Sequence, residues 1–226
     1  EEVGDILNYY SIKSKQLEIK KWYDGYVFGN NIIYNPWSVL NYAKEFNEGF
    51  RAYWINSSGN DLIKSILAKA DDTTKKEFED LVQGKSIHKQ IHEDIVMNEV
   101  NKDSENIWSF LLFSGYLKAV NQKLKEGIIY CDLQIPNLEV LTLYKKIIIS
   151  WFKDNIGNEK FQLMLKSLIS GDMETFELLL GECIVKSVSY FDIGNESEKF
   201  YHAFVLGMLI SLNKDYEINS NRESGY

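Results

Sequence analysis

Two histidines, His88 and His92, lie four residues apart, and their type and spacing suggest metal chemistry. On a helix, positions i and i+4 share one face, and zinc sites use two imidazoles at this spacing. No glutamate follows the first histidine, so the helix of zinc metalloproteases is not matched, and the sequence offers no evident third ligand. We therefore predict a polar helix face here and no metal site.

Nucleotide chemistry needs a phosphate-binding loop, and the sequence has none. No Gly-x-x-x-x-Gly-Lys-Ser/Thr segment occurs, so no run of backbone N–H groups is available to hold nucleotide phosphates. Residues 1–56 also contain no acid that follows a buried apolar strand and would hold the metal of an ATPase. We expect no ATP turnover from this chain by itself and no cofactor bound to it.

Three lysines, Lys118, Lys123 and Lys125, lie in a segment that predicts a β-hairpin. Strand patterns over residues 116–122 and 128–134 flank a turn at Gly127. A helix predicted over residues 105–114 precedes them, and a helix followed by a hairpin is how a winged-helix module ends. On such a wing the lysines could meet nucleic-acid phosphates. The alternative is a solvated edge strand that its lysines protect from pairing.

Dense aromatic segments lie near both ends of the chain. Trp-Tyr-Asp-Gly-Tyr-Val-Phe-Gly occupies residues 22–29, Tyr-Asn-Pro-Trp-Ser-Val-Leu residues 34–40, and Phe-Tyr-His-Ala-Phe-Val-Leu-Gly residues 200–207. In combination they resemble bacterial proteins that join an AAA-ATPase-like P-loop domain to a C-terminal PD-(D/E)XK nuclease-like domain. The resemblance runs over most of the chain and implies that it is the middle portion of such a protein, truncated at both ends.

The resemblance also implies a division of the chain. Its expected parts are the end of the ATPase-like domain (1–56), a helical, winged-helix-like region (57–136), a helical connector (137–183), and the first helix and strand of the nuclease-like domain (184–226). It implies ATP and Mg²⁺ as cofactors of the longer protein and DNA or RNA as its partner. None of these is expected to be bound in a complete site by this chain alone.

Glu198 is the position that matches the first acid of a nuclease-like centre in this resemblance. That centre needs a helix acid, a strand aspartate and a Glu-x-Lys to hold Mg²⁺, and only the first is in the chain. The residues themselves also fit a capping box, with Asn195 as N-cap and Glu198 at N3. His202, one turn later, and Arg222 are further candidate nucleic-acid contacts. Their alternatives are a packed histidine and an ordinary polar turn.

Asp24, Asn35 and Pro36 are implied by the same resemblance to lie near the nucleotide of the longer protein, with Asn35-Pro36 against the base. A simpler explanation needs no ligand. Asn35 suits a helix N-cap and Pro36 the first helical position, while Asp24 holds a turn.

The composition is that of a globular protein of 226 residues, 45% of them hydrophobic. Its 33 acidic and 25 basic residues give a net charge of −8, which argues against a broad nucleic-acid surface but leaves room for a local one. The longest apolar stretch, residues 204–212, is far shorter than the roughly 18–20 residues that span a bilayer, so no membrane partner is expected. Cys131 and Cys183 predict buried thiols in a reducing, cytoplasmic compartment.

The pattern along the chain predicts an α+β fold that is predominantly helical. Residues 1–21 indicate a helix and a short extended stretch, and Gly25 and Gly29 bracket an aromatic strand or turn. Further helices are expected after Asn35, from about Asn60, and after the cap at residues 71–73. Three more should follow Pro136, and a last helix (196–213) and a strand (216–220) end the chain.

Two functions fit these patterns. In the first, the longer protein is an ATP-dependent, nuclease-like enzyme acting on nucleic acid, and this chain is catalytically inactive in isolation. In the second, the region is a non-catalytic helical and winged-helix-like module that binds nucleic acid or protein.

Overall fold

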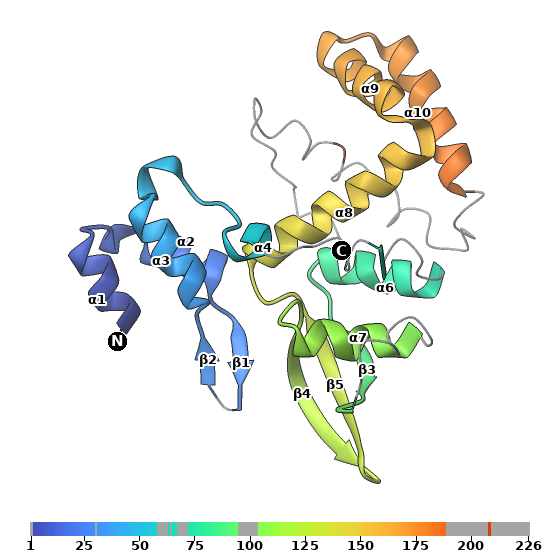
Figure 1. Cartoon of the computed structure of the whole chain (residues 1–226). Coiled ribbons are helices and arrows are strands. Elements are labelled where there is room, and N and C mark those ends of the chain that lie inside the picture. Colours follow the sequence, from blue (N-terminus) through green and yellow to red (C-terminus); the bar gives the residue numbers. More distant parts are fainter. Residues whose placement is uncertain are drawn as a thin grey trace, which may run out of the picture. The chain divides into compact units, whose positions relative to one another are not determined.

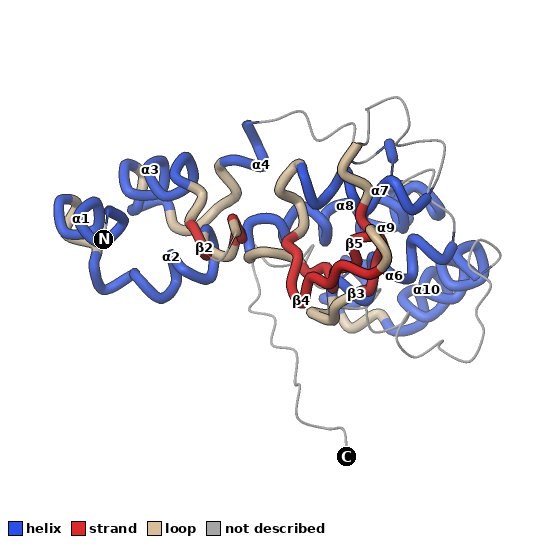
Figure 2. The backbone as a smooth tube through the Cα atoms, turned by 90° about the horizontal axis from the view of Figure 1, so that it is seen from below, coloured by secondary structure: helices blue, strands red, loops and turns tan. Residues whose placement is uncertain are grey.

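The computed structural model describes residues 2–29, 31–57, 63, 65–66, 72–94, 104–188 and 208. Over these residues the protein is α+β, as predicted, with many helices and two small antiparallel sheets (Figures 1 and 2). The chain divides into two compact units, which we call unit 1 (Glu1–Tyr144) and unit 2 (Lys145–Tyr226). Within the described ranges, no helix has the length and apolar character needed to cross a bilayer.

The elements of unit 1 follow the chain in this order: α1 (Glu2–Tyr9), η1 (Lys13–Lys15), α2 (Gln16–Tyr23), β1 (Tyr26–Phe28), β2 (Asn31–Ile33), α3 (Pro36–Lys44), η2 (Phe46–Glu48), α4 (Trp54–Ser57), α6 (Asp72–Val82), β3 (Ile87–Ile91), α7 (Ser104–Phe113), β4 (Lys118–Lys125) and β5 (Ile128–Gln134). Helix α8 (Leu138–Ile156) begins in unit 1 and continues into unit 2, where α9 (Asn158–Ser170) and α10 (Met173–Val188) follow.

Helices α1, α2 and α3 pack around one apolar cluster in unit 1. Its fully buried members come from all three helices and from the turn at Ile12: Leu7, Ile12, Ile19, Tyr23, Val39, Tyr42 and Ala43. Phe50 closes the cluster, because its ring stacks on Tyr42 with 4.3 Å between centroids. The extended stretch predicted within residues 1–21 is wrong. The chain there forms α1, η1 and the start of α2, and its helical turns place Leu7 and Ile19 in the buried cluster.

Helix α3 begins as the sequence predicts. The Asn35 side chain caps it by accepting a hydrogen bond from the Ser38 backbone N–H (3.2 Å), and Pro36 is the first helical residue. The β1–β2 hairpin precedes it, with Tyr26 opposite Ile33. Gly25 enters the hairpin at a φ of 101°, and a β-carbon there would lie 2.3 Å from the carbonyl oxygen of Pro136, so only glycine fits.

The second sheet of unit 1 has the strand order β3-β5-β4, with both pairs antiparallel. Helices α6 and α7 contact β3, and the strands lie side by side in both views (Figures 1 and 2). Behind the sheet, Phe78 of α6 stacks on Trp108 of α7 and meets Tyr144 of α8 edge to face. The predicted hairpin is confirmed, and so is the predicted helix that Gly115 ends at a φ of 80°.

The helix predicted around His88 and His92 is wrong, because this segment is strand β3. Ile87, Lys89 and Ile91 alternate with exposed or half-buried residues, a period of two rather than the three to four of a helix. Backbone pairing with β5 decided the outcome, since the strand lies against Ile129–Leu133 along its whole length. His88 belongs to the strand and His92 follows it, so they do not share a helix face.

Unit 2 contains α9 and α10, which pack against each other, and the part of α8 after Tyr144. The three helices predicted after Pro136 are confirmed. Their buried residues include Phe161, Met164, Leu165, Leu179 and Cys183. The last predicted helix and strand fall outside the described residues, apart from Met208. So does most of the helix expected from about Asn60, of which Ile63, Ser65 and Ile66 are described and helical.

Candidate nucleic-acid interface

One face of the three-stranded sheet is turned away from helices α6 and α7. Ile87, Lys89 and Ile91 are buried on the helix side, so the alternate residues of β3 lie on the other side. Residues directly opposite each other in an antiparallel pair share a face. Hence Asp132, which pairs with His88, lies on this second side too. We call it the open face.

All three lysines of the predicted hairpin lie on the open face. Lys118 pairs with Gln134, Lys123 with Tyr130, and Lys125 with Ile128, and these β5 residues alternate in phase with Asp132. Lys123 and Lys125 are exposed and Lys118 is half-buried.

A β-bulge between Val120 and Lys123 makes this arrangement possible. Two residues of β4, Asn121 and Gln122, oppose the single residue Cys131, and Asn121 adopts a left-handed φ of 52°. In a regular strand, residues an odd number apart point to opposite faces, so Lys118 and Lys123 would be separated by the sheet. The extra residue in the bulge shifts the alternation of β4 by one position, so Lys123 and Lys125 lie on the same face as Lys118.

Polar side chains from all three strands join across the open face. The Asp132 carboxylate contacts His88 Nδ1 (2.8 Å) and accepts a hydrogen bond from Asn121 Nδ2 (3.0 Å). The bond to His88, then that to Asn121, and finally the charge of Lys123 lower the pKa of Asp132 below its usual range. The His88 ring also stacks on Tyr130, with 5.7 Å between centroids and 3° between planes. These contacts favour the ionised carboxylate, so Asp132 is a negative charge among the lysines of the open face.

The helix side of the sheet has a different electrostatic character. Lys89 is buried there, where its ammonium contacts Glu77 (2.8 Å) and Glu105 (3.1 Å) and lies over the Trp108 ring. Burial by itself would lower the pKa of Lys89, but the two carboxylates raise it above the usual value. This cation is occupied within the fold and is not available to a ligand.

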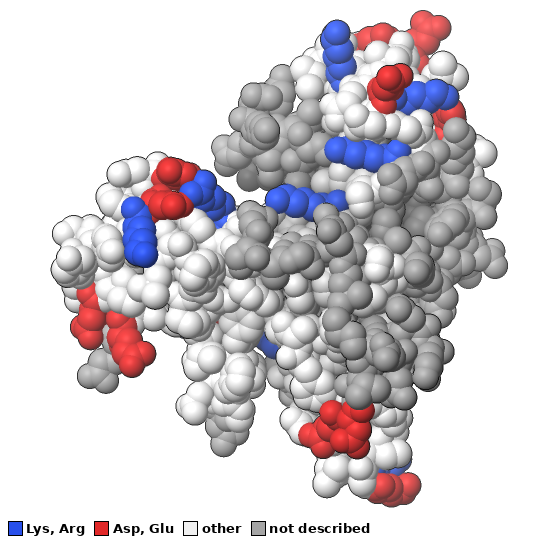
Figure 3. Space-filling model, viewed as in Figure 1, with Lys and Arg blue, Asp and Glu red and all other residues white. Residues whose placement is uncertain are grey.

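Helix α7 does not provide a basic surface. Its sequence contains no Lys or Arg, and its most exposed large side chain is Phe113. In the view of Figure 3, Asp and Glu atoms gather near the end of the sheet of unit 1. Compared with α7, the open face therefore carries the basic side chains.

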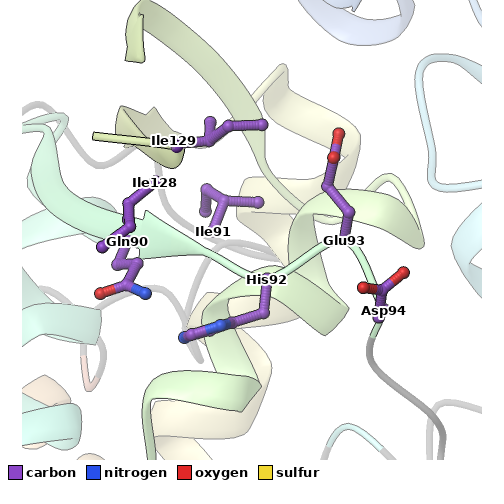
Figure 4. Close-up of a pocket in the computed structure, with 8 residues that line it drawn as sticks. Gln90, Ile91, His92, Glu93, Asp94, Ile128 and Ile129 are labelled. Atoms are coloured by element: carbon purple, nitrogen blue, oxygen red, sulfur yellow. The ribbon is translucent and has the colours of Figure 1, made fainter. Parts of the chain in front are cut away.

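A shallow pocket of about 280 Å³ lies where β3 ends and β5 begins. Its acidic and imidazole groups do not converge, because Glu93 and Asp94 lie to one side and His92 is directed to another (Figure 4). Among the residues that the structure describes, no group of three or more His, Cys, Asp or Glu is placed to hold a metal ion. The pocket has a polar rim without the geometry of a metal centre.

The three residues predicted to lie near a nucleotide, Asp24, Asn35 and Pro36, have structural positions in unit 1. Asp24 is buried, its backbone carbonyl accepts a hydrogen bond from Asn137 Nδ2 (3.0 Å), and its Oδ1 has no hydrogen-bond partner among the described residues. Asn35 and Pro36 form the start of α3. The positions of Asn35 and Pro36 fit the simpler explanation of a capped helix start. That Asp24 holds a turn, and that any of the three lies near a nucleotide, stay predictions.

Glu139 is a buried acid that the sequence patterns did not reveal. Its carboxylate accepts hydrogen bonds from the Ser38 hydroxyl (2.7 Å) and from the Trp54 backbone N–H (2.7 Å). It therefore ties the starts of α3 and α4 to the start of α8. Burial raises the pKa of Glu139, although its hydrogen bonds act in the opposite direction. In the sequence it looks like any acid in the first turn of a helix, so only its contacts identify it.

Glu198, His202 and Arg222 lie outside the described residues, so their predicted roles stay predictions. Cys131 and Cys183 are buried free thiols, as predicted. Comparison of the chain with protein-family models, with curated proteins and with solved structures finds no match in any of the three.

Proposed function

We propose that this chain is the nucleic-acid-contacting portion of a AAA-ATPase-like protein with a nuclease-like domain, and that its open face contacts the phosphate backbone. The observation that carries the proposal is the β4 bulge, which gathers Lys118, Lys123 and Lys125 on one face. A bulge changes the direction of side chains and interrupts the hydrogen bonding between two strands. Such bulges are frequent at the edges of sheets and next to active sites.

Charge supports a local site of this kind. The chain has a net charge of −8, so a nucleic acid would be repelled by the molecule as a whole and must find a restricted basic patch. Each lysine that neutralises a phosphate releases a counterion, which is the main source of sequence-independent affinity. Asp132 lies on the same face and its bonds to His88 and Asn121 favour its ionised form, so its one negative charge offsets part of the attraction of the three lysines.

The element order supports a winged-helix-like region. Helix α6, strand β3, helix α7 and the β4–β5 hairpin follow one another, and the hairpin would be the wing. Since α7 has no basic residue, we infer contact through the backbone of the nucleic acid rather than reading of base edges by this helix. The binding should therefore depend weakly on sequence.

The proposed activity of the longer protein depends on groups beyond this interface. Its nuclease-like centre would use Glu198 as the first acid, with Mg²⁺ and further acids, and its ATPase-like domain would use ATP. The test is Mg²⁺-dependent DNA cleavage by the longer protein and by its Glu198→Ala variant. Equal cleavage by both proteins would remove Glu198 from the mechanism.

Binding to the open face is tested with the chain itself. Fluorescence anisotropy with labelled DNA and RNA oligonucleotides, between about 50 and 200 mM salt, gives the affinity and its salt dependence. Changing Lys118, Lys123 and Lys125 together to Gln should weaken binding to every sequence and reduce the slope of log K against log salt by about 2 to 3.

The matched control changes three exposed lysines of α2 and α3 to Gln: Lys20, Lys21 and Lys44. Both triple variants have the same net charge, so a general charge effect would weaken them equally. A larger loss for the hairpin variant supports the open face. Equal losses, or no binding by the unmodified chain at low salt, would refute it.

A further inference from the structure

The β1–β2 hairpin exposes apolar side chains on both of its faces. Phe28 is 68% exposed and Ile32 67% exposed, and Val27 and Ile33 are about two-fifths exposed. In β-structure, the side chains of Val27 and Ile32 share one face, and those of Phe28 and Ile33 lie on the other. An apolar surface on both sides of a two-stranded hairpin is expected to be covered in the working protein.

The hairpin belongs to a segment without charge. Residues 25–43 contain no Asp, Glu, Lys, Arg or His, although 26% of the chain is charged. The same uncharged segment exposes Trp37 and Leu40 on α3, the helix that follows the hairpin. This is a patch defined by sequence and by exposure together, and we call residues 25–43 the uncharged segment.

The outer edge of β2 is open to pairing. Strand β1 contacts β4, and no strand in the described ranges pairs with β2 on its other side (Figure 1). Proteins that remain monomeric protect such edges with lysines, prolines or bulges. The β2 residues Asn31, Ile32 and Ile33 are all exposed and provide none of these.

We propose that the uncharged segment is a self-association surface, on which a second copy of this chain pairs its β2 edge antiparallel to the first. In a two-fold dimer the same patch meets itself, so a charge at the axis would face its own copy. A chain with a net charge of −8 therefore associates with itself most readily where it has no charge. The uncharged segment meets that condition and also presents apolar side chains and free backbone groups.

Ile32 is the expected centre of the pairing. Two residues separate Phe28 from Asn31, so these two close the turn and share a hydrogen bond, and bonded and non-bonded pairs alternate from there. The N–H and C=O groups of Ile32 are then expected to point to the open edge. A two-fold axis at this residue lets two copies of Ile32 exchange both hydrogen bonds, and the side chains of Ile32 and Val27 from each copy would lie on one face.

Sedimentation velocity of the chain between about 1 and 100 μM tests association directly. The mass should rise from 26.3 kDa towards twice that value as the concentration increases. Ile32→Lys adds an edge charge that meets its own copy and should weaken the dimer at least about tenfold. Leu17→Lys is the matched control, because Leu17 is 74% exposed on α2 and lies outside the segment. It should leave the dimer intact.

A cross-link tests the register. If Ile32 faces its own copy, the α-carbons lie about 5.5 Å apart, which is within reach of a disulfide. Ile32→Cys should then form a covalent dimer under mild oxidation, whereas Leu17→Cys should not. The native thiols will not interfere, since Cys131 and Cys183 are buried. A chain that stays monomeric throughout the range, or equal cross-linking of both variants, would overturn the proposal.

Discussion

Replacing Glu139 by alanine should destabilise unit 1 strongly, because this carboxylate is fully buried and bonded to two separate elements. The change would leave the Ser38 hydroxyl and the Trp54 backbone N–H inside the protein without their acceptor. Each orphaned donor costs about 1–3 kcal/mol, so the free energy of unfolding should fall by roughly 2–6 kcal/mol. Glu139→Gln keeps one oxygen acceptor and the size of the side chain, and its cost should be smaller.

The pH dependence of this cost has a definite sign. Burial raises the pKa of Glu139 in the folded protein, so the neutral form is favoured there relative to the unfolded chain. Its stabilising contribution is fully present below the unfolded pKa of about 4.3 and is lost as the pH rises through the raised folded value. Glutamine does not titrate. The difference in stability between the wild-type protein and Glu139→Gln should therefore be larger at pH 4 than at pH 7.

The assay must report on unit 1 separately, since a protein with two units need not unfold in a single step. Amide hydrogen exchange followed by peptide meets this need. In Glu139→Ala, peptides that cover Trp54 and the start of α3 should lose protection, by about tenfold for each 1.4 kcal/mol, while peptides of α9 should not change.

Glu93→Ala is the control for the loss of one negative charge, because Glu93 is exposed and its change should lie within about 0.5 kcal/mol. If Glu139→Ala exchanges no faster than Glu93→Ala around Trp54, the two hydrogen bonds do not hold α3 and α4 in place. The reasoning from the buried carboxylate would then be refuted.

Two further predictions concern single contacts. Gly25→Ala should lower the melting temperature, measured by thermal unfolding, by far more than Gly29→Ala. Both glycines have a positive φ, but only at Gly25 would a β-carbon collide with Pro136. The loss in free energy of unfolding for Gly25→Ala should exceed the roughly 1–2 kcal/mol of the backbone conformation alone. His88→Ala should raise the depressed pKa of Asp132 towards its usual value, which NMR titration of the carboxyl group measures. The stability that this carboxylate contributes is present above its unfolded pKa and is lost as the pH falls through the folded pKa. An unchanged pKa of Asp132 would contradict the bond to His88.

Much of the local structure was predictable because its signals are local. Asn35 and Pro36 mark the start of α3, and Gly115 marks the end of α7, through backbone preferences that act within a few residues. The β4–β5 hairpin is encoded by two strand patterns around one turn, and the helices of unit 2 by apolar residues three and four apart. Each of these elements carries its own evidence.

Strand β3 shows why prediction failed elsewhere. Its five residues are too short for a clear period, and the histidine spacing suggested a helix. Pairing with β5, more than thirty residues away, made it a strand, and no local signal reports that pairing. The candidate site has the same character. The lysines were visible as a group in the sequence, but the bulge that gives them one face depends on register with the partner strand.

The sequence by itself determined the α+β class, the start of α3 and the end of α7, the absence of a phosphate-binding loop and the uncharged stretch at residues 25–43. These follow from residue types and near neighbours. Only the tertiary structure decided that Lys118 and Lys123 share a face, that Lys89 is occupied by two carboxylates, and that Glu139 joins the starts of three helices. The physical reason is that a buried charge or a strand register is fixed by partners distant in the chain, whose positions exist only once the chain has folded.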